Sequence, residues 1–151
     1  MLSEPFIAAA AIAMFAEKGF TVRAEDFRPF IGAGEDRFIG GVAEAHGIPL
    51  EPARDKARTY AIYLEQIRGR LRPLPGVREF IATCTRRGLG LAVASGSDTV
   101  KVEANLSELG LPRALFAAIV TGSEVVRKKT RAGHLPRGVC ATRPGSLARA
   151  W

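Results

Sequence analysis

Cysteine and long hydrophobic runs are both scarce in this sequence. Its 151 residues include two cysteines, Cys84 and Cys140, which are too few for a disulfide framework and lack the spacing of metal ligands. The segment Phe6–Ala16 carries no charge, but eleven residues cannot span a bilayer, and the acidic Glu4 lies where a signal peptide would be positive. We therefore expect Phe6–Ala16 to form a buried helix, with no membrane segment, in a reducing compartment such as the cytoplasm.

Positive charge is abundant but unevenly distributed. The formal net charge is +7, yet residues 127–151 hold seven of the 22 Lys and Arg residues and none of the 15 Asp and Glu residues. Residues 1–126 are therefore neutral overall. A strongly basic protein is a candidate nucleic-acid binder, but here only the tail would make phosphate contacts. Nucleic-acid binding is thus an alternative of low rank.

Helical periodicity dominates the first half of the chain. The sequence predicts helices at residues 5–18, 35–46 and 52–69, and a short element around Glu25–Phe30. Apolar side chains fall on one face of the second helix at Phe38, Ile39, Val42 and Ala43, and of the third at Ala53, Ala57, Tyr60, Ala61, Leu64 and Ile67. These segments predict a helical bundle.

The pattern changes at residues 72–76, where Pro73, Pro75 and Gly76 form a stiff connector that we interpret as a domain hinge. Beyond it the sequence predicts a helix at 77–87, a strand at 91–94, a helix at 99–109 and a strand at 117–120. Short apolar strands suit burial on both faces, and this alternation indicates parallel strands with right-handed crossovers. The predicted fold class is α/β, with an incomplete Rossmann-like sheet.

Ser95 has the clearest chemical potential. It follows a predicted strand and precedes a predicted helix, and ligands of open α/β sheets bind at the carboxyl ends of the strands. The Ser95 hydroxyl and the N–H groups of Gly96, Ser97 and Asp98 could hold a phosphate oxygen at the helix N-terminus. The alternative is that Ser97 or Asp98 is simply a helix cap.

Two lysines follow the second predicted strand. Lys128 or Lys129 could return to the same sheet edge and neutralise a phosphate. The alternative is a solvated basic run.

Three stretches together resemble the haloacid dehalogenase superfamily. They are Arg-Pro-Leu-Pro-Gly-Val-Arg-Glu-Phe-Ile from Arg72, Arg-Gly-Leu-Gly-Leu-Ala-Val-Ala-Ser-Gly-Ser-Asp from Arg87, and Ala-Ile-Val-Thr-Gly-Ser-Glu from Ala118. Within it, the chain is similar to the β-phosphoglucomutase and phosphoglycolate phosphatase branch, which has a helical cap. Residues 25–42 also resemble the dehalogenase-like domain of the chloroplast suppressor-of-quenching proteins, which would place the chain in the chloroplast.

This resemblance implies a domain organisation and a reaction. Residues 5–71 would be a helical cap, residues 72–129 a partial core, and residues 1–4 a remnant of that core. The family transfers or hydrolyses the phosphoryl group of a small phosphorylated metabolite through an aspartyl-phosphate, assisted by magnesium. Ser95 falls on the second-motif Ser/Thr, which hydrogen-bonds the phosphoryl group, and Lys129 on the third-motif lysine.

Further residues acquire substrate-binding roles from the same resemblance. Gly96 and Ser97 would continue the phosphate loop, and Gly32 and Gly34 match the specificity loop of the cap. Where some relatives carry a phosphate-binding arginine just after that loop, this chain has Glu35, which argues against a sugar bisphosphate.

Two departures from the family pattern concern catalysis. The chain contains no Asp-x-Asp motif, which supplies the nucleophile and the general acid/base, and Met1–Phe6 resembles the stretch that follows that motif. No Asp or Glu follows Glu124, so the fourth-motif acid that binds magnesium is absent too. We therefore expect no metal site and no activity of this chain alone; a non-catalytic binding module that uses the cap surface is the alternative.

The tail offers an explanation. Relatives continue Lys-Pro-Ala-Pro-Asp-Ile-Phe-Leu-Ala after the third-motif lysine, whereas this chain continues differently from Thr130. With the third bases chosen freely, codons can be written for Thr130–Arg137 that encode Pro-Ala-Pro-Asp-Ile-Phe-Leu once the first base is dropped. We therefore predict that residues 130–151 form an irregular tail translated from a shifted frame.

Overall fold

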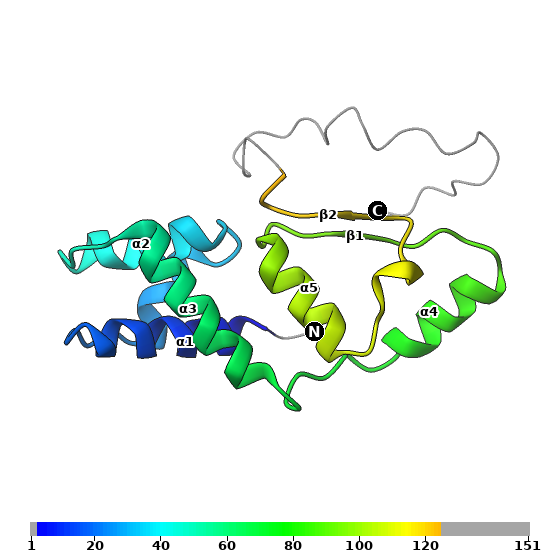
Figure 1. Cartoon of the computed structure of the whole chain (residues 1–151), viewed down its shortest axis with the longest axis horizontal. Helices are drawn as coiled ribbons and strands as arrows, with labels where there is room; N and C mark the ends of the chain where they lie inside the picture. Colours follow the sequence, from blue (N-terminus) through cyan, green and yellow to red (C-terminus); the bar gives the residue numbers. More distant parts are fainter. Residues whose placement is uncertain (1–2, 125–151) are drawn as a thin grey trace.

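The computed structural model describes residues 3–124, and its elements follow the predicted order (Figure 1). They are α1 (Glu4–Glu17), the 3-10 helix η1 (Ala24–Phe30), α2 (Glu35–Ala45), α3 (Pro52–Ile67), α4 (Val77–Arg86), β1 (Ala92–Ala94), α5 (Thr99–Glu108), the 3-10 helix η2 (Arg113–Leu115) and β2 (Ala118–Val120). In Figure 1, α1, α2 and α3 lie at one end of the molecule, α4 lies at the other, and α5 lies between them. We call α1–α3 with η1 the helical bundle.

Aromatic side chains join three elements of the helical bundle. The Phe27 ring of η1 lies 6.4 Å from the Phe15 ring of α1 and 4.8 Å from the Phe38 ring of α2, measured between centroids. The predicted apolar face of α2 is buried, as is that of α1 at Ile7, Ala10, Ala11, Met14 and Phe15. Burial of this much apolar surface is the main stabilising contribution to such a bundle.

The predicted buried face of α3 is wrong in part. Ala53, Ala57 and Ala61 are exposed, and the buried residues of the helix are Asp55, Thr59, Tyr60, Ile62, Tyr63 and Ile67. The polar members of this face have internal partners. The Asp55 carboxylate pairs with the Lys18 ammonium and accepts the Glu51 N–H at 2.9 Å, and the Thr59 hydroxyl donates to the Asp55 carbonyl at 2.8 Å. Their burial is therefore tolerated, and the small alanines face solvent.

The Lys18–Asp55 pair makes the helical bundle sensitive to acid. Burial raises the pKa of Asp55, but hydrogen bonds from Lys18 and from the Glu51 backbone outweigh it and lower the pKa below its usual value. The stability that Asp55 contributes is thus complete above about pH 4 and is lost as pH falls through its folded-state pKa. We expect Asp55→Asn to lower the free energy of unfolding at pH 7 and this difference to shrink towards pH 3, measured by urea denaturation. A difference that does not change with pH would contradict this assignment.

The two strands form a parallel sheet, as predicted, with Ala92, Val93 and Ala94 opposite Ala118, Ile119 and Val120. The expected burial on both faces is wrong, because Ala92 and Ala94 are exposed and Val93 is half-buried. Within residues 3–124, no element covers the face that carries Ala92 and Ala94. A strand is enclosed on both sides only where layers flank both faces of its sheet.

One hydrophobic cluster runs through the described part of the chain. It includes apolar residues of the helical bundle together with Leu109, Leu111 and Phe116, which follow α5. The domain boundary at residues 72–76 stays a prediction. None of the helices in residues 3–124 is long and apolar enough to cross a bilayer.

Candidate functional site

Ser95 lies directly after β1, at its carboxyl end. Its N–H donates to the Val120 carbonyl at 2.9 Å, which continues the ladder between the strands by one residue. The Ser97 N–H donates to the Ser95 Oγ at 3.2 Å. Because Oγ accepts this bond, the Ser95 O–H remains available to donate to another group. Residues 95–98, which we call the 95–98 loop, therefore form a turn that the Ser95 side chain closes.

A second loop packs tightly against the 95–98 loop. The Gly122 N–H donates to the Ser97 carbonyl at 2.8 Å. A Cβ added at Gly122 would lie 2.1 Å from the Gly96 carbonyl oxygen, far inside van der Waals contact. Glycine at position 122 thus permits the close approach of the two backbones.

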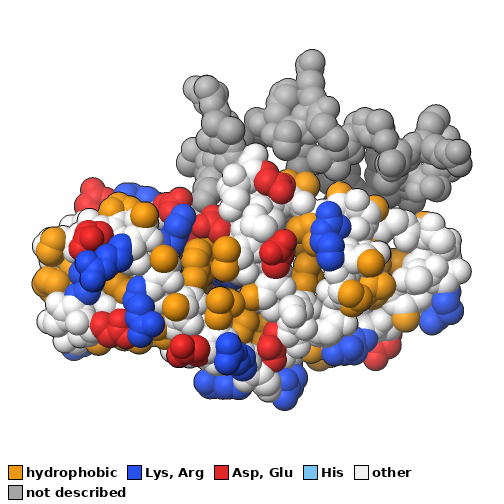
Figure 2. All heavy atoms as spheres, in the orientation of Figure 1, with side chains coloured by type: hydrophobic (Ala, Val, Ile, Leu, Met, Phe, Trp, Pro, Cys, Tyr) orange, Lys and Arg blue, Asp and Glu red, His pale blue; other side chains and the backbone are white. Residues whose placement is uncertain are grey.

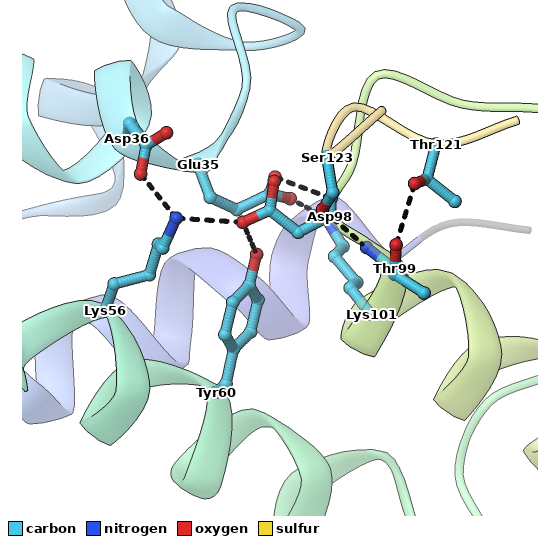
Figure 3. Close-up of polar contacts among 9 residues, drawn as sticks. All are labelled: Glu35, Asp36, Lys56, Tyr60, Asp98, Thr99, Lys101, Thr121 and Ser123. Atoms are coloured by element: carbon cyan, nitrogen blue, oxygen red, sulfur yellow. Dashed lines mark hydrogen bonds and ion pairs between the residues drawn. The ribbon is translucent and has the colours of Figure 1, made fainter. Parts of the chain in front are cut away.

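The first turn of α5 is held by the loop after β2 (Figure 3). Ser123 Oγ accepts the Thr99 N–H at 3.1 Å, and the Thr99 and Thr121 hydroxyls lie 2.8 Å apart. Asp98 occupies the N-cap position, but its side chain makes no capping hydrogen bond. The alternative in which the Asp98 side chain caps this helix is therefore not observed.

The Asp98 carboxylate instead faces α3 (Figure 3). It accepts a hydrogen bond from the Tyr60 hydroxyl at 2.9 Å, and it pairs with Lys56 Nζ at 3.0 Å. Lys56 Nζ also pairs with Asp36 at 2.6 Å. Burial and the nearby Glu35 and Asp98 carboxylates raise the pKa of Tyr60. Burial lowers the pKa of Lys56, but its bonds to Asp36 and Asp98 outweigh this and raise the pKa. Tyr60 is thus neutral and Lys56 charged near neutral pH, so the contact between the helical bundle and the 95–98 loop is polar and paired.

Glu35 and Lys101 form a second link across the same boundary. Lys101 Nζ lies 3.0 Å from Glu35 Oε1, and their side chains are only 7% and 5% exposed. The other carboxylate oxygen, Oε2, accepts the Asp98 N–H at 3.3 Å. Lys101 Nζ also lies 5.8 Å from the centroid of the Tyr63 ring, within the range of a cation–π contact. Glu35, expected to be a substrate-binding residue, is therefore also a structural partner of α5.

A cavity of about 170 Å³ lies between the helical bundle and the 95–98 loop. Its lining residues are Glu4, Ile7, Phe30, Ile31, Gly32, Gly34, Glu35, Phe38, Ser95, Gly96, Ser97 and Lys101. Ser95, Gly96, Ser97, Gly32, Gly34 and Glu35, which were predicted as site residues, are all among them, from two stretches about sixty positions apart. Asp98, whose N–H was also predicted to hold a phosphate oxygen, does not line the cavity, and this N–H donates to Glu35. Lys128 and Lys129 lie outside the described residues.

Lys101 was missed by sequence reasoning. It lies on a predicted helix, and Lys101, Val102 and Asn105 share its buried face. A lysine on a helix is ordinarily solvent-exposed and is buried only where it has a partner. The sequence signal was therefore too weak to separate Lys101 from surface lysines, and only its distant partner Glu35 accounts for its burial.

The described residues contain no group of three His, Cys, Asp or Glu side chains that could hold a metal ion. They do not by themselves form a magnesium site. Acidic and basic side chains are interspersed over the face of the molecule shown in Figure 2. The basic tail that suggested nucleic-acid binding lies outside the described residues.

A family model described as haloacid dehalogenase-like hydrolase matches residues 2–141. The chain belongs to the haloacid dehalogenase-like hydrolase family. The predicted membership and the predicted α/β fold are thereby confirmed. The match continues past Lys129 into the tail, whose shifted frame stays a prediction.

The chain is also similar to individual proteins. It is 39% identical to the protein SUPPRESSOR OF QUENCHING 1, chloroplastic, of Arabidopsis thaliana, over 79% of this chain and 12% of that protein. CbbY from Rhodobacter sphaeroides, crystallised with phosphate, is 25% identical with a TM-score of 0.76, over 85% of this chain and 61% of that one. CbbY has also been crystallised, as a mutant, with xylulose-(1,5)bisphosphate.

The fold recurs in a crystal structure described as a predicted phosphoglycolate phosphatase from Haemophilus somnus 129pt. That protein is 21% identical, with a TM-score of 0.69, and the match covers 84% of this chain and 60% of that one. The fold recurs as well in a structure described as a putative β-phosphoglucomutase from Thermotoga maritima, which is 23% identical with a TM-score of 0.62 over 84% of this chain and 58% of that one. The chain spans about three-fifths of the length of these neighbours and a far smaller part of the plant protein.

Proposed function

We propose that this chain supplies the cap and the phosphate-binding loop of a hydrolase that acts on a small phosphorylated metabolite through an aspartyl-phosphate. The observation that carries the proposal is the cavity, in which the 95–98 loop faces Gly32, Gly34 and Glu35 of the helical bundle. We further propose that the 151 residues bind phosphate without turning it over, because they contain no Asp-x-Asp motif. The chloroplast relative favours the chloroplast over the cytoplasm as its compartment.

Ser95 has the leading role in phosphate binding. Its hydroxyl donates to a phosphate oxygen while its Oγ accepts the Ser97 N–H, which holds the hydroxyl in place. The positive end of α5, which begins at Thr99, adds a favourable field for an anion at this loop. Lys129 would balance the phosphate charge from the segment after β2. Magnesium would add charge stabilisation in the family reaction, through ligands other than the described residues.

The size of the cavity favours a small ligand. This volume of about 170 Å³ is below the range of about 300–1,000 Å³ that is typical of pockets for drug-sized ligands, which favours a small ligand over a nucleotide. A phosphate carrying a short polar chain matches the available space. The phosphate bound to CbbY supports the same class of ligand.

Phosphate binding tests this proposal directly. We expect the chain to bind orthophosphate, and Ser95→Ala to weaken binding by about tenfold or more, the effect of one hydrogen bond to a charged group. Titration followed by calorimetry and by amide NMR shifts measures the affinity and places the ligand at the 95–98 loop. Ser107→Ala is the matched control, because Ser107 is an exposed residue of α5 outside the cavity. Phosphate affinity that is equal in Ser95→Ala and the unchanged chain would overturn the proposal.

A further inference from the structure

We propose that the Glu35–Lys101 pair makes the cavity selective for phosphate monoesters whose remaining part is uncharged, against ligands with a second anionic group. This inference rests on the proposed function and adds the substrate class to it. The pair is buried, lines the cavity and bridges the helical bundle to α5. It therefore lies where the part of a ligand beyond its phosphate would be accommodated.

The first step concerns the charges around the cavity. Among the described residues that line it, Lys101 is the one cation, whereas Glu4 and Glu35 are both acids. The Lys101 charge is matched by Glu35, whose second oxygen is bonded to the Asp98 N–H. A second anionic group on the ligand would thus lose its hydration and meet a neutral ion pair and an additional carboxylate. Burying a charge without a partner is strongly unfavourable.

The second step concerns uncharged polar groups. A ligand hydroxyl can donate to the Glu35 carboxylate or to a backbone carbonyl of the loop at Gly32–Gly34. The two sides of the cavity are close enough for one short ligand to reach both, since a Cβ added at Gly96 would lie 4.0 Å from the Gly32 carbonyl oxygen. A short polyol phosphate therefore satisfies the 95–98 loop and the helical bundle together.

The third step predicts how the selectivity can be reversed. In Glu35→Gln the side-chain shape is kept, but Lys101 is left with an unbalanced buried charge. An anionic group on the ligand then becomes its counter-ion. We expect a gain of about tenfold or more in affinity for an anionic ligand relative to a matched neutral one. The double variant Glu35→Gln, Lys101→Met removes both charges and should abolish that gain.

Glycerol 3-phosphate and 3-phosphoglycerate are matched probes, because one ends in a hydroxyl group where the other ends in a carboxylate. Their dissociation constants, and that of orthophosphate, are measured by calorimetry on the full chain and the two variants. Glu44→Gln is the control, because Glu44 belongs to an exposed ion pair with Arg37 on α2. We expect the unchanged chain and Glu44→Gln to favour glycerol 3-phosphate.

Each outcome of this experiment is decisive. If the unchanged chain binds orthophosphate but binds 3-phosphoglycerate as well as or better than glycerol 3-phosphate, the selectivity inference is wrong and the proposed function stands. If no probe binds, orthophosphate included, the proposed function fails and the inference fails with it. If Glu35→Gln does not fold, the unchanged chain is compared with the double variant Glu35→Gln, Lys101→Met instead. The inference is overturned if both proteins prefer glycerol 3-phosphate over 3-phosphoglycerate to the same extent.

Discussion

Purified chain is expected to show no phosphatase or phosphomutase turnover above background. The 151 residues contain no Asp-x-Asp motif, so the aspartyl-phosphate of the family reaction cannot form on them. The missing general acid alone corresponds to a factor of about 10²–10⁴ in rate. The measurement is phosphate release or phosphate transfer with magnesium and a panel of small phosphate monoesters.

The control for this prediction is Ser95→Ala, which lacks the proposed phosphate-binding hydroxyl. Background hydrolysis should be the same in both proteins. Turnover that is well above background in the unchanged chain and lost in Ser95→Ala would reveal a nucleophile elsewhere in these residues. It would also contradict the proposal that this chain binds phosphate without turning it over.

Replacing Gly122 by alanine is expected to damage both stability and phosphate binding. The new Cβ would lie 2.1 Å from the Gly96 carbonyl oxygen and 3.2 Å from that of Ser97. These are backbone atoms, so the clash can be relieved only by moving the 95–98 loop or the loop after β2. Overpacking of this kind costs about 1–3 kcal/mol. We expect a loss of this size in the free energy of unfolding and weaker orthophosphate binding.

Gly90→Ala is the matched control for this substitution. Gly90 precedes β1, and a Cβ added there would meet no atom within 4 Å. Urea denaturation and phosphate titration of the two variants separate a specific clash from a general effect of replacing glycine. If Gly122→Ala matches Gly90→Ala in both measurements, the two loops are less tightly packed than the structure indicates.

The helices and strands whose formation depends on residues close together in the sequence were predictable. The helices at α1, α2 and α5 and the two short strands follow from apolar periodicity, proline and glycine, which act over a few positions. The burial of Phe38, Ile39, Val42 and Ala43 was predicted for the same reason. The position of Ser95 at the end of a strand required only the order of strand, glycine and helix.

The buried face of α3 could not be obtained in this way. Alanine suits either side of a helix, so Ala53, Ala57 and Ala61 carry little information about the direction of the core. The face is decided by Asp55, whose charge is tolerated in the interior only because Lys18 reaches it from α1. The strand faces were misjudged for a similar reason, since an apolar run at Ala92–Ala94 does not specify how many layers flank the sheet.

By itself, the sequence determined the order of the elements and the family, because each depends on short stretches of chain. It also predicted a phosphate loop at residues 95–98 and a specificity loop at Gly32 and Gly34. Only the tertiary structure decided that these two loops line one cavity and that Glu35 meets Lys101 across 66 positions. Whether a charged side chain is solvated or buried depends on two free energies: the cost of removing the charge from water and the gain from its interaction with a partner that is distant in the sequence. That balance exists only once α2 and α5 are packed together.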